Sequence, residues 1–184
     1  MVHDMMMMQE EYPKMKVLTN FGFKQENQEL KHWKQLVNYN NGIQGVAVGI
    51  DEIQNWFKSG QNQLPEGMLE VVTQNRKNHR VLCCTAQVFT RVNKAIREQV
   101  TLVYNPHTYL GCFTVLVKRK PIFDSEGNVL DLKYRGMYCF VHTDELREAY
   151  DTYKVIHTLA KEGFKEPPAQ SITNVYVAAE GKRK

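Results

Sequence analysis

The chain has 184 residues, of which 42% are apolar and 24% are charged, with 11 glycines and 6 prolines. This composition excludes a disordered chain and a collagen-like repeat, and the length suffices for a globular domain with its own hydrophobic core. The formal net charge of +4 permits contact with nucleic acid but is far below that of a dedicated DNA-binding tail.

Neither a membrane span nor an export signal is predicted. The longest nearly uncharged apolar run, residues 111–117, is much shorter than the ~20 residues of a membrane-spanning helix. Residues 1–8 lack the basic region, the longer apolar run and the cleavage site of a signal peptide. We therefore expect the protein to stay in the compartment in which it is made.

Metal ligation by cysteine or histidine is not indicated. The cysteines, which have no Cys-x-x-Cys spacing and fall in strand-like segments, are Cys83, Cys84, Cys112 and Cys139. Buried, reduced thiols are expected in such segments rather than metal ligands. The six histidines likewise show no paired-ligand spacing.

The first part of the chain alternates helix-like and strand-like segments. In chain order, we expect a helix at 2–11, a strand at 16–23, a helix at 29–37, a strand at 46–50, a helix from 65 toward 79, a strand at 81–87, a helix at 91–99 and a strand at 101–104. Strands that alternate with helices at this spacing predict an α/β fold with a parallel sheet covered on both faces.

The pattern changes after Pro106. Two long strand-like runs, 113–123 and 129–142, are joined by the turn-rich segment Asp124-Ser125-Glu126-Gly127-Asn128 and predict an antiparallel hairpin. Thr143 is the expected N-cap of a last helix that runs to 163. We therefore expect a core at 1–105, a hairpin plus C-terminal helix packed on the same domain at 106–165, and a loose basic tail at 166–184.

Two adjacent carboxylates, Asp51 and Glu52, follow the apolar strand VAVGI. Ligands bind at this edge of an open parallel sheet. In phosphate-handling sites of this kind, the first acid organises Mg²⁺ and the second orients or deprotonates the attacking water. We assign these roles to Asp51 and Glu52. The alternative is that the pair merely begins the next helix, because acids favour the first turn of a helix.

Thr85 and Gln87 place polar groups near the end of the next predicted strand, at the same edge of the sheet. A glutamine beside a magnesium-nucleotide site can sense the γ-phosphate or position water. The alternative is an ordinary capped strand end.

The segment from GVAVGIDEIQNWF through LPEGMLEVVTQNRKNHRVLCCTAQVFTRVNKAIREQV resembles the Walker B and following-strand region of the zonula occludens toxin-like ATPases. These are filamentous-phage assembly and export proteins within the P-loop DNA-pumping ATPases that include FtsK and HerA. The resemblance rests on the strand with Asp51-Glu52, the aromatic pair Trp56-Phe57, the arginine-rich helix end at 74–80 and the motif Thr85-x-Gln87. It covers about residues 16–104.

The resemblance implies a P-loop NTPase fold of the RecA-like (ASCE) type, with ATP and Mg²⁺ as cofactors. It implies that Asp51 helps to hold Mg²⁺, that Glu52 activates water, that Gln87 acts as the sensor, and that Thr85 helps to bind the nucleotide. Ring-forming members also present an arginine to the nucleotide of a neighbouring subunit, and Arg76 and Arg80 are the candidates. For both, the alternative is a solvated basic helix face.

A P-loop is missing from the sequence. The motif G-x-x-x-x-G-K-[ST], whose backbone N–H groups and lysine hold the phosphates, does not occur. In the resembling family the P-loop strand lies between the strands predicted here at 81–87 and 101–104. We therefore expect the first strand and its P-loop to be absent from a truncated core, or to be supplied by another chain. A redesigned, nucleotide-free domain is the remaining alternative.

The leading interpretation is the ATPase core of a viral DNA packaging or export motor, inactive as this chain alone. The expected partners are DNA of a viral genome, further copies in a homo-oligomeric ring, and viral assembly proteins. The expected location is the host cytoplasm, or the inner face of a membrane through a partner. The alternative is a non-catalytic remnant that binds DNA or protein.

A basic and aromatic group on the predicted hairpin is a further candidate for contact with nucleic acid. It consists of Lys118, Arg119, Lys120, Lys133, Tyr134 and Arg135. A solvated sheet edge that carries lysines is the alternative.

Overall fold

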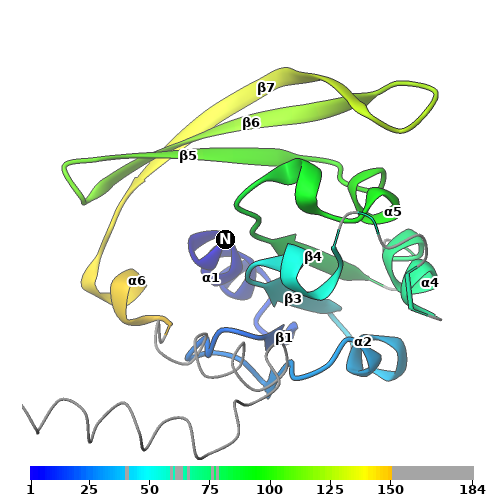
Figure 1. Cartoon of the computed structure of the whole chain (residues 1–184). Coiled ribbons are helices and arrows are strands. Elements are labelled where there is room, and N and C mark those ends of the chain that lie inside the picture. The colour runs from blue at the N-terminus through cyan, green and yellow to red at the C-terminus, as the bar shows by residue number, and fades with distance from the viewer. Residues whose placement is uncertain are drawn as a thin grey trace, which may run out of the picture.

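The computed structural model describes residues 1–39, 42–58, 60, 64–65, 67–75, 77 and 79–150. Two sheets organise this part of the chain into a mixed α/β fold (Figure 1). The elements are α1 (Val2–Glu11), β1 (Lys16–Thr19), β2 (Gln28–Glu29), α2 (Lys34–Asn38), β3 (Val46–Ile50), α3 (Ile53–Trp56), α4 (Met68–Thr73), β4 (Arg80–Cys84), α5 (Lys94–Arg97), β5 (Val103–Tyr109), β6 (Phe113–Phe123), β7 (Val129–Val141) and α6 (Asp144–Glu148), with a 3₁₀ turn at Phe89–Arg91.

The first sheet is parallel and has the order β2-β1-β3-β4. Leu18 of β1 lies opposite Val48 of β3, and Val48 lies opposite Leu82 of β4. The predicted parallel sheet is therefore confirmed, and so are the predicted bounds of α1 and β3. The predicted strands at 16–23 and 81–87 are shorter in the structure, so that polar residues follow each strand end.

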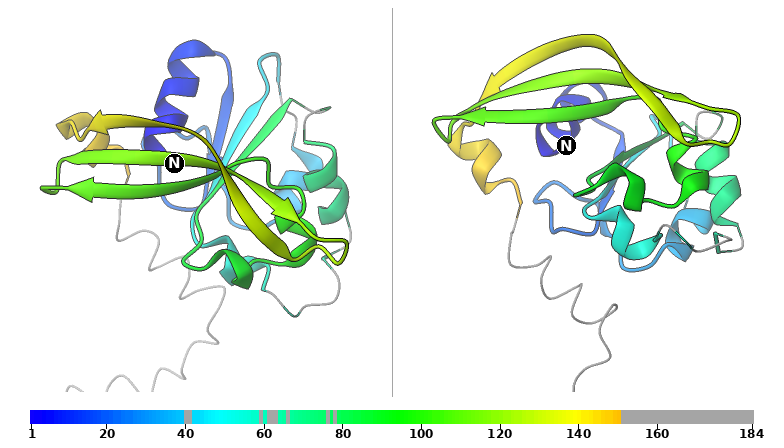
Figure 2. Two further views of the ribbon diagram at one scale, coloured as in Figure 1. Left: turned by 90° about the horizontal axis from the view of Figure 1, so that it is seen from above. Right: turned by 45° about the horizontal axis from the view of Figure 1, so that its top comes forward.

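Side chains of the parallel sheet alternate between two apolar cores, one on each face. Val17 and Ala47 pack with Met5 of α1 on one face. The other face carries a larger core that includes Leu18, Leu36, Val48, Ile50, Phe57, Met68 and Ile96. Figure 2 shows the same arrangement, with α1 on one side of the parallel sheet and α2, α4 and α5 on the other.

Gly49 in β3 allows α1 to approach the sheet closely. A Cβ atom at this position would lie 2.9 Å from Sδ of Met5 and 2.9 Å from Cε1 of Phe21. Both side chains are buried, so neither has free space into which to move. The absence of a side chain at Gly49 therefore sets the distance between α1 and the strand that leads to Asp51.

We expect Gly49→Ala to lower the free energy of unfolding by about 1–3 kcal/mol, because the added methyl group overpacks a full core. Urea unfolding followed by far-UV circular dichroism measures the change. The matched control is the double variant Met5→Ala/Gly49→Ala, since removing Met5 opens space for the new Cβ atom. Its destabilisation should be smaller than the sum of the two single effects, and strict additivity would show that Met5 does not restrict this position.

The second sheet is antiparallel, with the order β5-β6-β7. The predicted hairpin of β6 and β7 is confirmed. The prediction that 101–104 adds a strand to the parallel sheet is wrong, because Val103 pairs with Arg119 of β6 and β5 continues to Tyr109. Pro106 within β5 has no N–H to donate, and the edge position of β5 tolerates this loss. The domain boundary predicted between 105 and 106 falls inside β5.

The antiparallel sheet lies over the parallel one, as both views of Figure 2 show. Side chains of α1 contact its β7 strand. The ring of His3 stacks on Phe140 with a centroid distance of 4.0 Å, and the hydroxyl of Tyr138 donates a hydrogen bond to Asp4. Burial and the neighbouring Asp4 carboxylate raise the pKa of Tyr138. Lys118 Nζ lies 4.8 Å from the centroid of the Tyr138 ring.

Apart from α1, the predicted helices are shorter in the structure, and one of them is partly wrong. Gln28–Glu29, at the start of the helix predicted at 29–37, pairs with β1 as a two-residue strand. Thr143 does cap α6, accepting a hydrogen bond from Leu146 N at 3.2 Å. The predicted continuation of this helix beyond 150 and the tail at 166–184 lie outside the described residues.

All four cysteines are free thiols, but only two are even partly buried, whereas burial was expected for all four. Cys83 and Cys112 are half-buried, whereas Cys84 and Cys139 are exposed. Burial raises the pKa of Cys83 to about 11, so this thiol is protonated at neutral pH.

Among the described residues, none of the helices has the length and apolar character that crossing a membrane requires.

Candidate functional site

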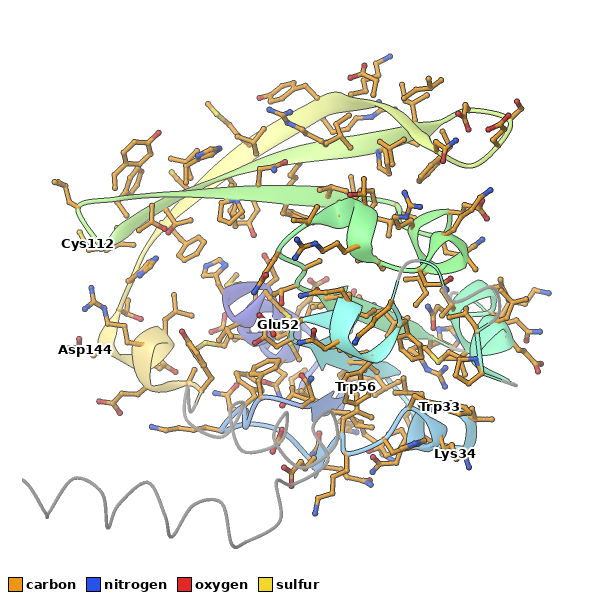
Figure 3. The ribbon with its side chains drawn as sticks, in the orientation of Figure 1. Trp33, Lys34, Glu52, Trp56, Cys112 and Asp144 are labelled. Carbon is orange, nitrogen blue, oxygen red and sulfur yellow. The ribbon has the colours of Figure 1, made fainter. Side chains whose placement is uncertain are left out.

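A cluster of polar side chains lies at the carboxyl edge of the parallel sheet, where β1, β3 and β4 end. Asn20 follows β1, Asp51 and Glu52 follow β3, and Thr85 follows β4. Figure 3 labels Glu52 in the middle of the molecule, beside α3. The parallel register brings these residues together, because Thr19 lies opposite Gly49 and Ile50 lies opposite Cys84.

Asp51 is held on both its backbone and its side chain. Its backbone N–H donates to Asn20 Oδ1 at 2.7 Å, and its carbonyl accepts from Asn20 Nδ2 at 3.1 Å. The hydroxyl of Thr85 donates to the Asp51 carboxylate. Asn20 is only 4% exposed, so this double contact joins the ends of β1 and β3 below the surface.

Glu52 turns the chain at the end of β3 in a left-handed backbone conformation, with φ 51° and ψ 52°. This conformation costs a non-glycine residue about 1–2 kcal/mol. Its N–H donates to Thr85 Oγ1 at 2.9 Å. Its two carboxylate oxygens accept from Gln87 Nε2 at 2.8 Å and from Asn55 Nδ2 at 2.7 Å. The carboxylate is therefore oriented from both sides.

Thr85 links the two strand ends through four hydrogen bonds. Its hydroxyl contacts Asp51 and Glu52 as described, its N–H donates to Ile50 O at 3.0 Å, and its carbonyl accepts from Ile53 N at 3.0 Å. Thr85 thus continues the β3–β4 pairing past the ends of both strands and fixes the turn that carries the acidic pair.

The structure brings four of the predicted site residues, Asp51, Glu52, Thr85 and Gln87, into one hydrogen-bonded network. Glu52 stands at the N-cap position of α3, yet its side chain makes no capping hydrogen bond. The alternative role of the acidic pair as a helix start therefore has no capping contact to support it. The catalytic roles assigned to these residues stay predictions.

Of the two predicted arginines, the structure describes Arg80, which is not part of this network. Arg80 begins β4 at the opposite edge of the sheet, is only 7% exposed and donates from Nη2 to Leu36 O at 2.9 Å. The Arg80 guanidinium is thus buried against its own chain, and its role toward a neighbouring subunit stays a prediction. Arg76 lies outside the described residues.

Sequence reasoning missed Asn20 and Asn55. The predicted strand at 16–23 ran past Asn20, which hid the fact that an amide follows the apolar residues Val17 and Leu18 at the same sheet edge. A shorter strand that ended at Thr19 would have placed Asn20 beside the acidic pair. Asn55 stands three residues after Glu52, a spacing at which side chains on one helical turn meet.

The site residues offer oxygen ligands of the kind that Mg²⁺ prefers, and Mg²⁺ as a cofactor stays a prediction. Among the residues that the structure describes, no group of three or more His, Cys, Asp or Glu side chains could hold a metal ion. Protein sites for nucleotide-bound Mg²⁺ need only one or two carboxylates, because water and phosphate oxygens complete the coordination.

β4, although its sequence is that of a central strand, lies at the edge of the sheet. Within the described ranges β4 pairs only with β3. Val81 is 45% exposed and Cys84 is exposed as well. The only charged residue of β4 is Arg80, which is buried, whereas edge strands normally expose charges or proline. The unpaired edge runs directly toward Thr85.

Comparisons with known proteins support the fold. The sequence matches no protein-family model, and a search of curated proteins finds no match. Among solved structures, the N-terminal domain of zonular occludens toxin from Neisseria meningitidis is similar, with a TM-score of 0.50 and 16% identity. The match covers 74% of this chain and 80% of that one. At this identity the likeness shows the fold alone.

We expect Thr85→Val to destabilise the protein by about 1–3 kcal/mol, because the Glu52 N–H and the Asp51 carboxylate both lose their contact with the hydroxyl. Valine has nearly the same shape, so packing changes little. Thr85→Ser, which retains the hydroxyl, is the matched control and should stay close to the wild type. Urea unfolding measures both variants, and equal stability of the valine and serine proteins would show that the hydroxyl has no such role.

Proposed function

We propose that the polar cluster binds the magnesium and γ-phosphate end of ATP, and that the protein is the nucleotide-hydrolysing core of a Zot-like motor that moves DNA during virion assembly. The observation that carries this proposal is the network in which Thr85 and Gln87 orient the carboxylates of Asp51 and Glu52. Two acids held in this way at the carboxyl edge of a parallel sheet suit phosphoryl transfer, which depends on positioning and charge.

Each residue of the network has a distinct role in this proposal. Asp51 and Thr85 would hold Mg²⁺, which would offset charge on the phosphate oxygens. Glu52 orients the attacking water, since each carboxylate oxygen has a second lone pair besides the one that accepts from Gln87 or Asn55. Gln87, which follows the end of β4, donates a hydrogen bond to the Glu52 carboxylate. A movement of the Gln87 amide would therefore change the position of Glu52, the proposed base.

Phosphates also need backbone N–H groups around them, and the glycine-rich motif that supplies these is not in the sequence. A strand that carried such a phosphate-binding loop could pair with the free edge of β4, which would place the loop beside Thr85. The missing motif is also the observation that favours the second candidate, a chain that keeps the acidic edge and binds DNA or protein without turnover.

Binding of MgATP is tested by NMR titration of the ¹⁵N-labelled chain, which detects affinities in the millimolar range. We expect MgATP to shift the amide signals of Glu52, Ile53 and Thr85, and we expect Asp51→Asn to remove these shifts. The matched control is Asp131→Asn, which removes one exposed carboxylate of β7. If the three signals do not move, or move equally in Asp51→Asn, the nucleotide site is not at this edge.

Hydrolysis is tested separately by phosphate release. We expect negligible turnover from the 184-residue chain, because no phosphate-binding loop accompanies the acids. If the protein with a complementing P-loop strand turns over ATP, Glu52→Gln should lower its rate by about 10²–10⁴, the usual size of a general-base contribution. An unchanged rate in Glu52→Gln would show that Glu52 is not the base.

A further inference from the structure

One face of the antiparallel sheet is apolar although it points away from the rest of the molecule. Residues directly opposite each other in an antiparallel ladder share a face, and so does every second residue of a strand. Val115 of β6 lies opposite His107 of β5 and Cys139 of β7, and the next such row on each side continues the same face. The register is regular over these rows, because its shifts lie beyond Lys118. This outer face consists of Asn105, His107, Tyr109, Phe113, Val115, Val117, Met137, Cys139 and Val141.

The opposite, inner face of the same strands packs on α1. Leu116 of β6 is buried, and its partner on β7, Tyr138, donates a hydrogen bond to Asp4 of α1. Phe140, on the same side of β7 as Tyr138, stacks on His3. In Figure 1 and in both views of Figure 2, no described helix or strand lies over the other side of β5, β6 and β7. The outer face is therefore directed to solvent.

The outer face is exposed despite its composition. Met137 is 67% exposed, Val141 60% and Tyr109 56%, and the Cys139 thiol is exposed as well. The outer-face residues of the central strand β6 are half-buried. An antiparallel sheet with one solvated face normally carries polar residues on that face. This one has neither an acid nor a lysine or arginine, so water solvates it poorly and a contiguous apolar patch results.

The turn between β5 and β6 adds an exposed leucine at the end of the sheet. Leu110 is 97% exposed and has φ 50°, and Gly111, which follows it, has φ 68°. The N–H of Cys112, labelled in Figure 3, donates to Tyr109 O at 3.2 Å and closes the turn. Positive φ values in tight turns are normally taken by glycine, asparagine or aspartate. Leucine at this position has a backbone cost and a solvation cost, and contact with an apolar partner offsets the second.

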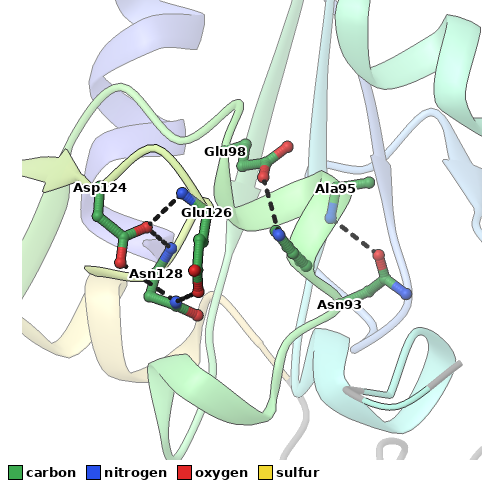
Figure 4. Close-up of polar contacts among 7 residues, drawn as sticks. Asn93, Ala95, Glu98, Asp124, Glu126 and Asn128 are labelled. Carbon is green, nitrogen blue, oxygen red and sulfur yellow. Dashed lines mark hydrogen bonds and ion pairs between the residues drawn. The ribbon is translucent and has the colours of Figure 1, made fainter. Parts of the chain in front are cut away.

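Contacts within the chain hold the other end of the β6–β7 hairpin. In the loop between these strands, the Asp124 carboxylate accepts from the backbone N–H of Glu126 at 2.9 Å and of Asn128 at 2.7 Å (Figure 4). A Cβ atom at Gly127 would overlap the side chain of Glu98, so the loop lies directly against the end of α5. The hairpin is thus fixed before any partner binds, which lowers the entropic cost of association.

We propose that the outer face binds the same face of a second copy of this chain, with the two sheets packed against each other about a twofold axis. A twofold interface places one surface patch against itself, so a charged patch would repel its own copy. The outer face has no acidic or basic side chain of that kind apart from His107. Two sheets with the same right-handed twist also match in shape and pack about 10 Å apart.

The size of the outer face predicts a reversible dimer. Three strands about 4.8 Å apart, with five residues at about 3.4 Å spacing along each, give an outline of about 14 Å by 17 Å. This is smaller than a standard interface, which buries about 800 Å² of each partner. The contact closes at two copies, whereas a ring needs two different surfaces on each subunit. The inference therefore goes beyond the proposed function and does not depend on the nucleotide site.

Self-association is tested by sedimentation velocity of the full chain from about 1 μM to about 1 mM, the range of weak dimers. The average mass should rise from that of one chain toward that of two. Val115→Lys places a positive charge from each copy at the centre of the interface and should weaken dimerisation at least about tenfold. Met137→Lys, at a position that is 67% exposed in the single chain, should act in the same direction without disturbing the fold.

The matched control is Leu69→Lys, which introduces the same charge at a leucine of α4 that is 52% exposed and lies outside the outer face. It should dimerise as the wild type does, and far-UV circular dichroism verifies that all variants are folded. Absence of self-association up to about 1 mM would overturn the proposal and leave the face to a different partner. Dimerisation that Val115→Lys and Met137→Lys do not weaken, or that Leu69→Lys weakens equally, would overturn it as well.

The thiol of Cys139 locates the contact independently. Cys139 lies beside Val115 in the outer face, so its alkylation by iodoacetamide should slow as the protein concentration rises. In Val115→Lys the rate should not depend on concentration. A Cys139 rate that stays constant while the wild type dimerises would place the interface elsewhere and overturn the proposal.

The nucleotide site and the dimer face can be tested separately. Val115→Lys should retain the MgATP-induced shifts of Glu52 and Thr85, and MgATP should not change the self-association of the wild type. Loss of the shifts alone would count against the nucleotide site, and loss of self-association alone would count against the dimer.

Discussion

The parallel pairing of β3 with β4 is the constraint on which the candidate site depends. Its register places Thr85 beside the turn that follows β3, where one hydroxyl contacts both the carboxylate of Asp51 and the N–H of Glu52. Asn20 adds the same kind of link from β1. The left-handed conformation of Glu52 is sustained by these contacts, since an isolated chain would avoid it. The acids are therefore held in place by neighbouring strands that lie far away in sequence.

The two sheets divide the molecule into parts with different surfaces. The parallel sheet is covered on both faces, and its carboxyl edge carries the polar cluster. The antiparallel sheet lies across it and is held by α1 through His3 and Asp4. The outer edge of β4 has no strand partner within the described residues. A phosphate-binding loop next to that edge would join the acidic pair to the remainder of a nucleotide site.

Sequence reasoning succeeded where the signal is local. The apolar run Val46–Ile50, the turn-rich Asp124–Asn128 and the cap at Thr143 each have short-range chemistry that the structure retains. It failed where a distant partner decides. The strand-like composition of residues 101–104 suits either sheet. Pairing with β6 placed β5 in the antiparallel sheet. Gln28–Glu29 forms a short strand, despite its polar side chains, because it pairs with β1.

The sequence by itself determined that one apolar strand ends at Asp51-Glu52 and that the polar Thr85 and Gln87 lie near the end of the next strand, because both patterns can be seen without coordinates. It did not determine where β1 and β4 end, at Thr19 and Cys84. Only the tertiary structure decided which of these residues meet. It joined Asn20 to Asp51 and Gln87 to Glu52, and it buried Arg80 at the opposite edge beside Leu36. The physical reason is that hydrogen bonds between strand ends depend on register and strand order, which arise from packing across the whole sheet rather than from any single segment.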